Sequence, residues 1–374
     1  IVHDTEARFD QDAWWPVHPL DADGGPRAPL FPLYFGACGV IWALHYLDAV
    51  GAASATRDYR DDVPLLLPLN RAWLEGSGSR DFASYLMGDT PILMLRHWLA
   101  PRADVLDELH RLIAENIDNP TRELMWGSPG TMLAALLLHR HTGEARFAEA
   151  FVATARRLKS QLVHSREFNC DYWTQDMYGQ TSSYIDAVHG FVGTALPLIH
   201  GRDLLAPHEW DDWAARIVAT VARTATREGD LANWRPWLYP AASDRALLMQ
   251  YCHGAPGFVV CLADLPGTDL DELLVAAGEA TWVAGPLRKG SNLCHGTAGN
   301  GYAFLKLHRR MRDAQWLARA RAFAMHAIDQ FDEHADRYGQ LRYSLWTGDL
   351  GLAIYLWNCI EGGATFPTLD VFFT

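Results

Sequence analysis

The sequence predicts an all-α protein, an α/α toroid in which about seven inner helices are enclosed by about seven outer ones. Three observations support this fold class. A glycine-led motif followed by an apolar run recurs seven times along the chain. Amphipathic segments lie between the copies, and the alternation typical of strands is scarce. Because one helical hairpin cannot bury its apolar face alone, we expect repeated hairpins to close around a common core.

The recurring motif predicts the inner helices. Each copy contains apolar or aromatic residues, Gly, two further residues, a second Gly and an apolar run; in the second copy Pro91 replaces the second glycine. The leading glycines are Gly36, Gly88, Gly127, Gly190, Gly254, Gly296 and Gly348. Paired glycines permit close backbone approach and a positive φ where a helix begins. A run that is apolar on nearly all sides indicates a buried helix. Helix packing alone is the alternative explanation of the glycine pairs.

The segments between the repeats predict the outer helices. In 207–228, Trp213 and Ile217 share one face with other apolar residues, while charged residues point elsewhere. The segment 312–334 has the same pattern. We expect the whole chain, residues 1–374, to form a single barrel domain, since a closed repeat architecture can exceed the roughly 250–300 residues of a simple core.

Two long segments rich in aromatic residues, 160–188 and 229–250, are predicted to be loops. Loops of this length in a compact domain often carry function, so we expect them to form walls or a lid over a site.

Composition and charge disfavour several classes of protein. The formal net charge is −13 and no run of Lys and Arg suits a nucleic-acid backbone, so no nucleic-acid partner is expected. No stretch of 18 apolar residues predicts a membrane span, and the first residues do not resemble a signal peptide. Six cysteines are too sparse for a disulfide scaffold, which favours a cytoplasmic location with free thiols. We expect a monomer.

Repeats four, five and six place chemically active residues before the leading glycine. Repeats five and six read Cys252-His253 and Cys294-His295, and repeat four carries His189. Inner helices of a toroid begin at one rim, so these residues are expected to converge. Two thiolates and one imidazole are a typical zinc set, and three protein ligands leave a fourth position for water or substrate. The sequence therefore predicts a Zn²⁺ site formed by Cys252, Cys294 and His295.

The two other histidines are assigned different roles. A fourth protein ligand would close the metal site, so His253 is interpreted as a pocket or substrate-binding residue. His189 has no neighbouring cysteine and is interpreted as a proton-transfer group, with a hydrogen-bonded packing histidine as the alternative. The remaining cysteines are interpreted as buried or semi-buried thiols: Cys38, Cys170, Cys261 and Cys359.

Several stretches resemble the signature segments of the lanthionine synthetase C-like family. They are DRALLMQYCHGAPG, LCHGTAGNGYAFL and VHGFVG, supported by the weaker ELMWGSPGTMLAALL and YSLWTGDLGLAIYL in the family's order. The resemblance covers nearly the whole chain. It implies a barrel of seven inner and seven outer helices with zinc held at one mouth by Cys252, Cys294 and His295. It also implies an acid/base role for His189 and a pocket role for Arg245, for which a surface ion pair is the alternative.

Two departures separate the chain from bacterial peptide cyclases of that family. Those cyclases commonly carry Cys-Tyr-Gly where this chain has His253 after the cysteine, and an Asp in the third repeat, where Trp126, Gly127 and Ser128 supply no acid. Both departures resemble the stand-alone members found outside lanthipeptide operons.

The resemblance implies addition of a thiol, such as glutathione or a peptide cysteine, to dehydroalanine or dehydrobutyrine, which forms a thioether. His189 would protonate the α-carbon, and Arg245 would stabilise the oxyanion or bind a carboxylate. One alternative is a cyclase that forms lanthionine rings within a dehydrated precursor peptide, and another is a non-catalytic protein that binds zinc or glutathione. A glycosidase would require two carboxylates, and Asp89, Asp186 and Asp349 form no convincing pair.

Overall fold

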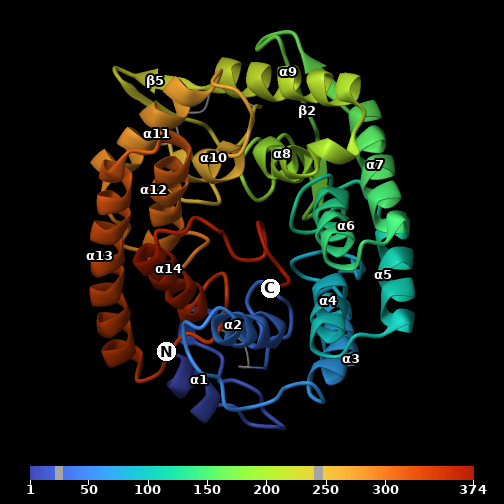
Figure 1. Ribbon diagram of the computed structural model, residues 1–374, viewed down its shortest axis with the longest axis vertical. Helices are drawn as coiled ribbons and strands as arrows, with labels where there is room; N and C mark the ends of the chain where they lie inside the picture. Colours follow the sequence, from blue (N-terminus) through green and yellow to red (C-terminus); the bar gives the residue numbers. More distant parts are fainter. Residues whose placement is uncertain (22–27, 240–246) are drawn as a thin grey trace.

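The computed structural model describes residues 1–21, 28–239 and 247–374, and in these ranges the chain forms two concentric rings of helices (Figure 1). Each inner helix begins within two residues of a leading glycine. The inner helices are α2 (Ala37–Ala49), α4 (Thr90–Leu99), α6 (Ser128–Thr142), α8 (Phe191–His200), α10 (Ala255–Leu262), α12 (Thr297–Met311) and α14 (Asp349–Glu361). The prediction of an α/α toroid is confirmed.

The outer ring surrounds these helices in chain order, and the short α1 lies outside α2 (Figure 1). Its members are α1 (Val2–Ala7), α3 (Val63–Gly76), α5 (Ala103–Glu115), α7 (Ala145–Ser160), α9 (Pro207–Thr224), α11 (Asp271–Ala284) and α13 (Ala314–Tyr338). Two short 3₁₀ helices, η1 (Pro19–Asp21) and η2 (Arg202–Leu204), complete the helical elements of the described residues.

The two rings differ in burial as the sequence pattern predicts. In α6 every residue from Ser128 to Leu138 is buried, because outer helices cover one side and other inner helices the rest. In α9 only one face is buried, and it includes Trp213 and Ile217. This outer helix ends at Thr224, four residues before the predicted boundary, because Ala225 is extended and leads into a hairpin.

The leading glycines are required for close backbone approach, and the predicted positive φ is wrong for most of them. Gly36 and Gly190 have φ values of −128° and −129°, which other residues adopt readily. A Cβ on Gly190 would lie 2.2 Å from the backbone nitrogen of Asp186, which no side chain can accommodate. Gly254 is the exception, with a φ of 120°. The turn before each helix folds back onto the helix start, and this contact excludes a Cβ.

The first predicted loop segment contains two short antiparallel hairpins, and a third hairpin spans the beginning of the second segment. The first holds β1 (Val163–Ser165) paired with β2 (Cys170–Tyr172), and β3 (Gln175–Met177) paired with β4 (Gln180–Ser182). The third hairpin pairs β5 (Thr226–Glu228) with β6 (Leu231–Asn233).

The C-terminal segment after α14 passes through the interior of the inner ring (Figure 1). Phe366 stacks on Tyr251, the residue before Cys252, with ring centroids 4.9 Å apart. The indole of Trp42 donates a hydrogen bond to the carbonyl oxygen of Phe372 at 3.0 Å. The segment therefore supplies part of the core on which the residues preceding the inner helices are packed. Within the described ranges, no helix combines the length and the apolar character that crossing a membrane requires.

Candidate metal centre and its adjoining cavities

A belt of backbone hydrogen bonds brings the turns before the inner helices together. Six of its members share one position, two residues before a leading glycine: Tyr34, Leu86, Met125, Cys252, Cys294 and Trp346. Val188 at the same position of repeat four accepts instead from the amide of Leu124 at 3.3 Å. The amide of Cys252 donates to the carbonyl of Cys294 at 3.0 Å, Cys294 donates to Trp346 at 2.9 Å, and Trp346 donates to Tyr34 at 3.0 Å. Similar bonds join Tyr34 to Leu86 and Leu86 to Met125. Because neighbouring repeats are joined at this position, the two cysteines meet although they are distant in sequence.

Cys252, Cys294 and His295 form one cluster at this rim. One ligand atom from each lies within 4.8 Å of the other two, and both cysteines are buried. The pKa of Cys294 is held well below the usual thiol range, first because Cys252 donates a hydrogen bond to it; burial opposes this, and His295 and Tyr34 add to it. The same hydrogen bond and burial raise the pKa of Cys252. Two sulfur atoms and one imidazole nitrogen fit the preferences of Zn²⁺.

Two neighbouring side chains donate hydrogen bonds to the sulfur atoms. The hydroxyl of Tyr34 donates to Sγ of Cys294 at 2.7 Å, and Nε2 of Gln250 donates to Sγ of Cys252 at 3.0 Å. Nζ of Lys289 in turn donates to Oε1 of Gln250 at 3.0 Å, which fixes the orientation of the amide. Partners of this kind orient metal ligands and adjust their electron donation.

His189 lies beside the cluster and is oriented by a buried carboxylate. Its Nδ1 is 3.0 Å from Oε2 of Glu123, whose side chain is fully buried. The same carboxylate accepts hydrogen bonds from the backbone amides of Met125 and Trp126. Burial lowers the pKa of His189, but the hydrogen bond and charge of Glu123 outweigh it, so the net pKa is raised. With Nδ1 directed at Glu123, Nε2 is the nitrogen available to a substrate.

His253 forms a second pair of the same kind outside the cysteine cluster. Its Nδ1 lies 2.6 Å from Oδ2 of Asp186, whose side chain is also fully buried. Oδ1 of the same carboxylate accepts hydrogen bonds from the amides of Val188 and His189. The rings of His253 and His189 have centroids 6.4 Å apart. The structure thus places His253 on the cavity wall next to His189. Arg245, the remaining predicted site residue, lies outside the described residues.

Sequence reasoning missed both carboxylates. In the third repeat Trp126, Gly127 and Ser128 supply no acid, whereas Glu123 lies four residues before that glycine. Asp186, discarded as half of a glycosidase pair, lies four residues before its own leading glycine. A polar residue at this position caps the amides of the turn, as the side chain of Asn292 also does for His295. This recurring position four residues before glycine is the signal that would have found them.

Two cavities meet at the cluster. The smaller, of about 630 Å³, is lined by the two cysteines of the cluster and by the imidazoles of His189, His253 and His295. A group of basic side chains also lines it: Arg288, Lys289, His334, Arg337 and Arg342. We call it the basic cavity.

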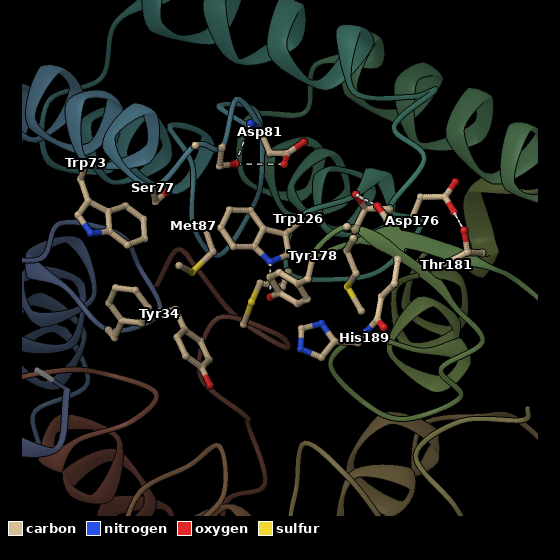
Figure 2. Close-up of a pocket in the computed structure, with 18 residues that line it drawn as sticks. Tyr34, Trp73, Ser77, Asp81, Met87, Trp126, Asp176, Tyr178, Thr181 and His189 are labelled. Carbon is tan, nitrogen blue, oxygen red and sulfur yellow. Dashed lines mark hydrogen bonds between the residues drawn. The ribbon is translucent and has the colours of Figure 1, made fainter. Parts of the chain in front are cut away.

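The larger cavity, of about 1040 Å³, is lined by a group of aromatic and methionine side chains together with uncharged polar residues and with Asp81, Asp176 and His189 (Figure 2). We call it the aromatic cavity. Tyr34, Met125 and His189 line both cavities, so the two spaces adjoin at the side chains nearest the cluster. The hairpin formed by β3 and β4 contributes Met177 and Tyr178 to its wall, so part of segment 160–188 lies where a site wall was predicted.

Comparison with known proteins agrees with this geometry. Residues 101–371 match the family model described as lanthionine synthetase C-like protein. Glutathione S-transferase LANCL1 of Danio rerio is 34% identical over 257 residues, which are 67% of this chain and 62% of that protein. LanC-like protein GCL1 of Arabidopsis thaliana is 27% identical over 247 residues, 63% of this chain and 54% of that protein. The matched regions therefore span less than two thirds of either relative.

A solved structure, that of nisin cyclase, shares the fold. It superposes with a TM-score of 0.59 over 89% of this chain and 94% of its own, at 15% sequence identity.

Proposed function

Because the chain belongs to the lanthionine synthetase C-like family, we propose that it is a zinc-dependent enzyme that adds a thiol to dehydroalanine or dehydrobutyrine residues of peptides or proteins. The product is a thioether, and glutathione is the proposed thiol. The observation that carries this proposal is the junction of the Cys252, Cys294 and His295 cluster with the carboxylate-oriented His189, at a place open to two cavities.

The cluster supplies the proposed metal site. Cys252, Cys294 and His295 would hold Zn²⁺, leaving a position for the substrate thiol. A zinc ion bound there lowers the pKa of a coordinated thiol, so that a nucleophilic thiolate is available near neutral pH. Tyr34 and Gln250 hold the two cysteine sulfur atoms in place through the hydrogen bonds described above.

The basic cavity suits an anionic thiol. Arg288, Lys289 and Arg337 line it together with the cysteines, and glutathione carries two carboxylates that such side chains bind through charge-assisted hydrogen bonds. The name of the zebrafish relative includes glutathione, which agrees with this choice of donor.

The polar side chains of the rim account for the proton balance. A bond forms between sulfur and the β-carbon, and the π electrons of the double bond move to an enolate at the α-carbon. The α-carbon gains one proton, which we assign to Nε2 of His189 because Glu123 orients this imidazole and raises its pKa, which favours the protonated form. The proton lost by the thiol passes to solvent, and solvent returns a proton to His189 before the next turnover. We assign substrate binding to His253, held by Asp186, and oxyanion or carboxylate binding to Arg245.

One experiment tests the metal and the reaction together. The purified protein is analysed for metal content, loaded with zinc, and incubated with glutathione and a dehydroalanine peptide, and products are followed by mass spectrometry. We expect one zinc per chain and a peptide mass increased by that of glutathione. Replacing Cys294 with Ala should abolish both. Absence of metal from the wild-type protein, or an unchanged peptide under zinc-loaded conditions, would contradict the proposal.

Two further arms distinguish the other functions. A dehydrated peptide with its own cysteine, given without glutathione, would form a ring at unchanged mass if the protein were a cyclase. Replacing His189 with Ala should stop turnover while zinc and glutathione remain bound; undiminished turnover would exclude the proposed proton donor.

A further inference from the structure

The aromatic cavity differs sharply in chemistry from the basic one. Large aromatic and methionine side chains line one part of it, and Trp73, Met87, Trp126 and Tyr178 are seen in Figure 2. Small or uncharged polar residues complete the lining: Ser77, Gly78, Ser79, Thr121, Gly179, Gln180 and Thr181. The ionisable side chains of Asp81, Asp176 and His189 also line it, and no Lys or Arg does so among the residues that the structure describes. A ligand for this space therefore places apolar groups against the aromatic and methionine side chains and carries no negative charge near the two carboxylates.

The cavity begins at the reacting centre. Tyr34 and His189 line both cavities, and the hydroxyl of Tyr34 donates a hydrogen bond to Sγ of Cys294. An electrophile whose β-carbon lies beside the sulfur and whose α-carbon lies beside His189 therefore has the aromatic cavity as one direction for the rest of its chain. At about 1040 Å³ the space is as large as the roughly 300–1,000 Å³ pockets that bury whole drug-sized ligands.

The wall is preformed by contacts among its own side chains. Trp73 packs edge-on against Phe35 with ring centroids 5.5 Å apart. The indole of Trp126 donates a hydrogen bond to the hydroxyl of Tyr178 at 2.9 Å. Tyr178 lies at the turn of the β3–β4 hairpin with a positive φ of 52°, and 67% of its surface is exposed. The methionines add flexible, polarisable surface that adapts to side chains of differing shape.

Charge reinforces the distinction between the cavities. Asp81 accepts hydrogen bonds from Nδ2 of Asn119 and from Ser79, both uncharged, so its negative charge is not neutralised by these partners. Asp176 pairs with Arg122 at 3.3 Å, and that arginine is not part of the cavity lining. An acidic side chain entering here would lose hydration and meet like charge.

We propose that the aromatic cavity binds the peptide segment next to the dehydroamino acid, and that it selects electrophiles with apolar or aromatic neighbours over those with acidic neighbours. This inference rests on the proposed thiol addition, and it assigns the second substrate to the second cavity. The anionic thiol enters through the basic cavity, and the apolar-flanked electrophile occupies the aromatic one.

The test compares dehydroalanine peptides of equal length whose neighbouring residues are Phe and Leu, Lys, or Glu. A small electrophile, N-acetyl-dehydroalanine methylamide, cannot extend along the cavity and serves as the reference. With zinc-loaded protein and glutathione, kcat/KM should be about tenfold or more higher for the Phe/Leu peptide than for the Glu peptide. The same order should appear in the affinities of unreactive peptides that carry Ala in place of dehydroalanine.

Three variants connect the preference to the cavity. Trp73→Ala should lower the ratio of kcat/KM for the Phe/Leu peptide to that for the small electrophile about tenfold. Asp81→Asn should raise kcat/KM for the Glu peptide severalfold, and it changes few contacts, so it remains informative if Trp73→Ala folds poorly. Trp282→Ala removes an equally large ring from outer helix α11. It should change neither the ratio for the Phe/Leu peptide nor kcat/KM for the Glu peptide.

The outcomes separate this inference from the proposed function. Addition to all peptides and to the small electrophile at similar rates, whatever the neighbours, would overturn the cavity assignment and leave the thiol addition intact. Failure to modify even the small electrophile would overturn the thiol addition, while the affinities of the unreactive peptides would still show whether the cavity discriminates among them.

Discussion

Oε2 of Glu123, in the turn of the third repeat, lies 3.0 Å from Nδ1 of His189, in the turn of the fourth repeat. The two residues are 66 positions apart in the sequence. The pair sets both the orientation and the acidity of the imidazole. Burial alone would lower the pKa of His189, and the buried carboxylate reverses that direction.

Removing the charge of Glu123 should therefore shift the pH profile. A proton donor must be protonated to act, so kcat/KM should fall as pH rises through the pKa of His189. Glu123→Gln leaves burial as the main effect and lowers that pKa, so the descending limb should move to lower pH, with activity at pH 8 reduced about tenfold or more. The measurement is kcat/KM against pH, with Glu123→Asp as the conservative control. A variant whose kcat/KM is lower at every pH, with no shift of the descending limb, would show that Glu123 has only a structural role.

Tyr34→Phe should change the electronic state of the proposed metal site. Without the hydroxyl, Sγ of Cys294 loses a hydrogen-bond donor at 2.7 Å and becomes a stronger electron donor. In protein loaded with Co²⁺, the sulfur-to-cobalt charge-transfer band should move to lower energy, and metal affinity should change by up to about 100-fold. Tyr178→Phe removes a hydroxyl that contacts Trp126 instead and should leave the band in place. Identical spectra for both variants would contradict a role of Tyr34 at the sulfur.

Lys306→Met should destabilise the barrel strongly. The side chain of Lys306 is fully buried, and its Nζ lies 3.1 Å from Asp264 and 2.7 Å from Asp370 of the C-terminal segment. Arg309 still pairs with Asp264, but the largely buried Asp370 loses its cation beside a second carboxylate, which costs about 3 kcal/mol of unfolding free energy. Lys159→Met breaks the more exposed pair with Asp212 and should cost less than about 1 kcal/mol. Urea denaturation at constant pH measures both, and equal losses would refute the comparison.

Asp349→Asn should stabilise the protein in a pH-dependent way. Burial raises the pKa of Asp349 to about 6 from its usual 3.8. The folded state thus binds this proton more tightly than the unfolded state, so the stabilising contribution is complete below about pH 4 and is lost as pH rises through 6. Asparagine stays neutral and can still accept the hydrogen bond from the amide of Arg342.

The gain in unfolding free energy for Asp349→Asn should approach about 3 kcal/mol at pH 8, since the pKa shift is about two units at 1.36 kcal/mol each. At pH 4 the variant and the wild type should differ little. Thermal or urea unfolding at both values checks this, and a gain that is independent of pH would show that burial of the carboxylate charge is not the cause.

Much of the fold could be predicted because the hydrophobic pattern of each segment indicates whether its helix is buried on all sides or on one face. The all-round apolar runs identified the inner helices, and the one-sided pattern around Trp213 identified α9. The predicted positive φ at the glycines failed because a sequence shows that a Cβ is absent but not which contact excludes it. At Gly190 the reason is the approach of the preceding turn to the backbone of Asp186.

The candidate site was predicted less completely. The sequence identified Cys252, Cys294 and His295 because the pair Cys-His precedes the leading glycine in both repeat five and repeat six. The structure brings these three residues into one cluster. Glu123 was not singled out and Asp186 was considered only as a member of a carboxylate pair, because a single sequence does not show which side chain of a neighbouring repeat a carboxylate contacts. Only the folded turns show that each one both caps its own turn and holds the imidazole of the next repeat.

The sequence by itself determined the ring of helices and the phase at which sulfur and imidazole donors occur, because the hydrophobic pattern and the repeated glycines act within each repeat. Tertiary structure decided which donors acquire carboxylate partners and how the space around them divides into a basic and an aromatic cavity. Those properties depend on contacts between neighbouring turns, made through the backbone belt that joins Cys252 to Cys294 and Trp346 to Tyr34. The polar position four residues before most of the leading glycines recurs in the sequence, but the partner that each of these side chains meets in the next repeat does not show in a single sequence.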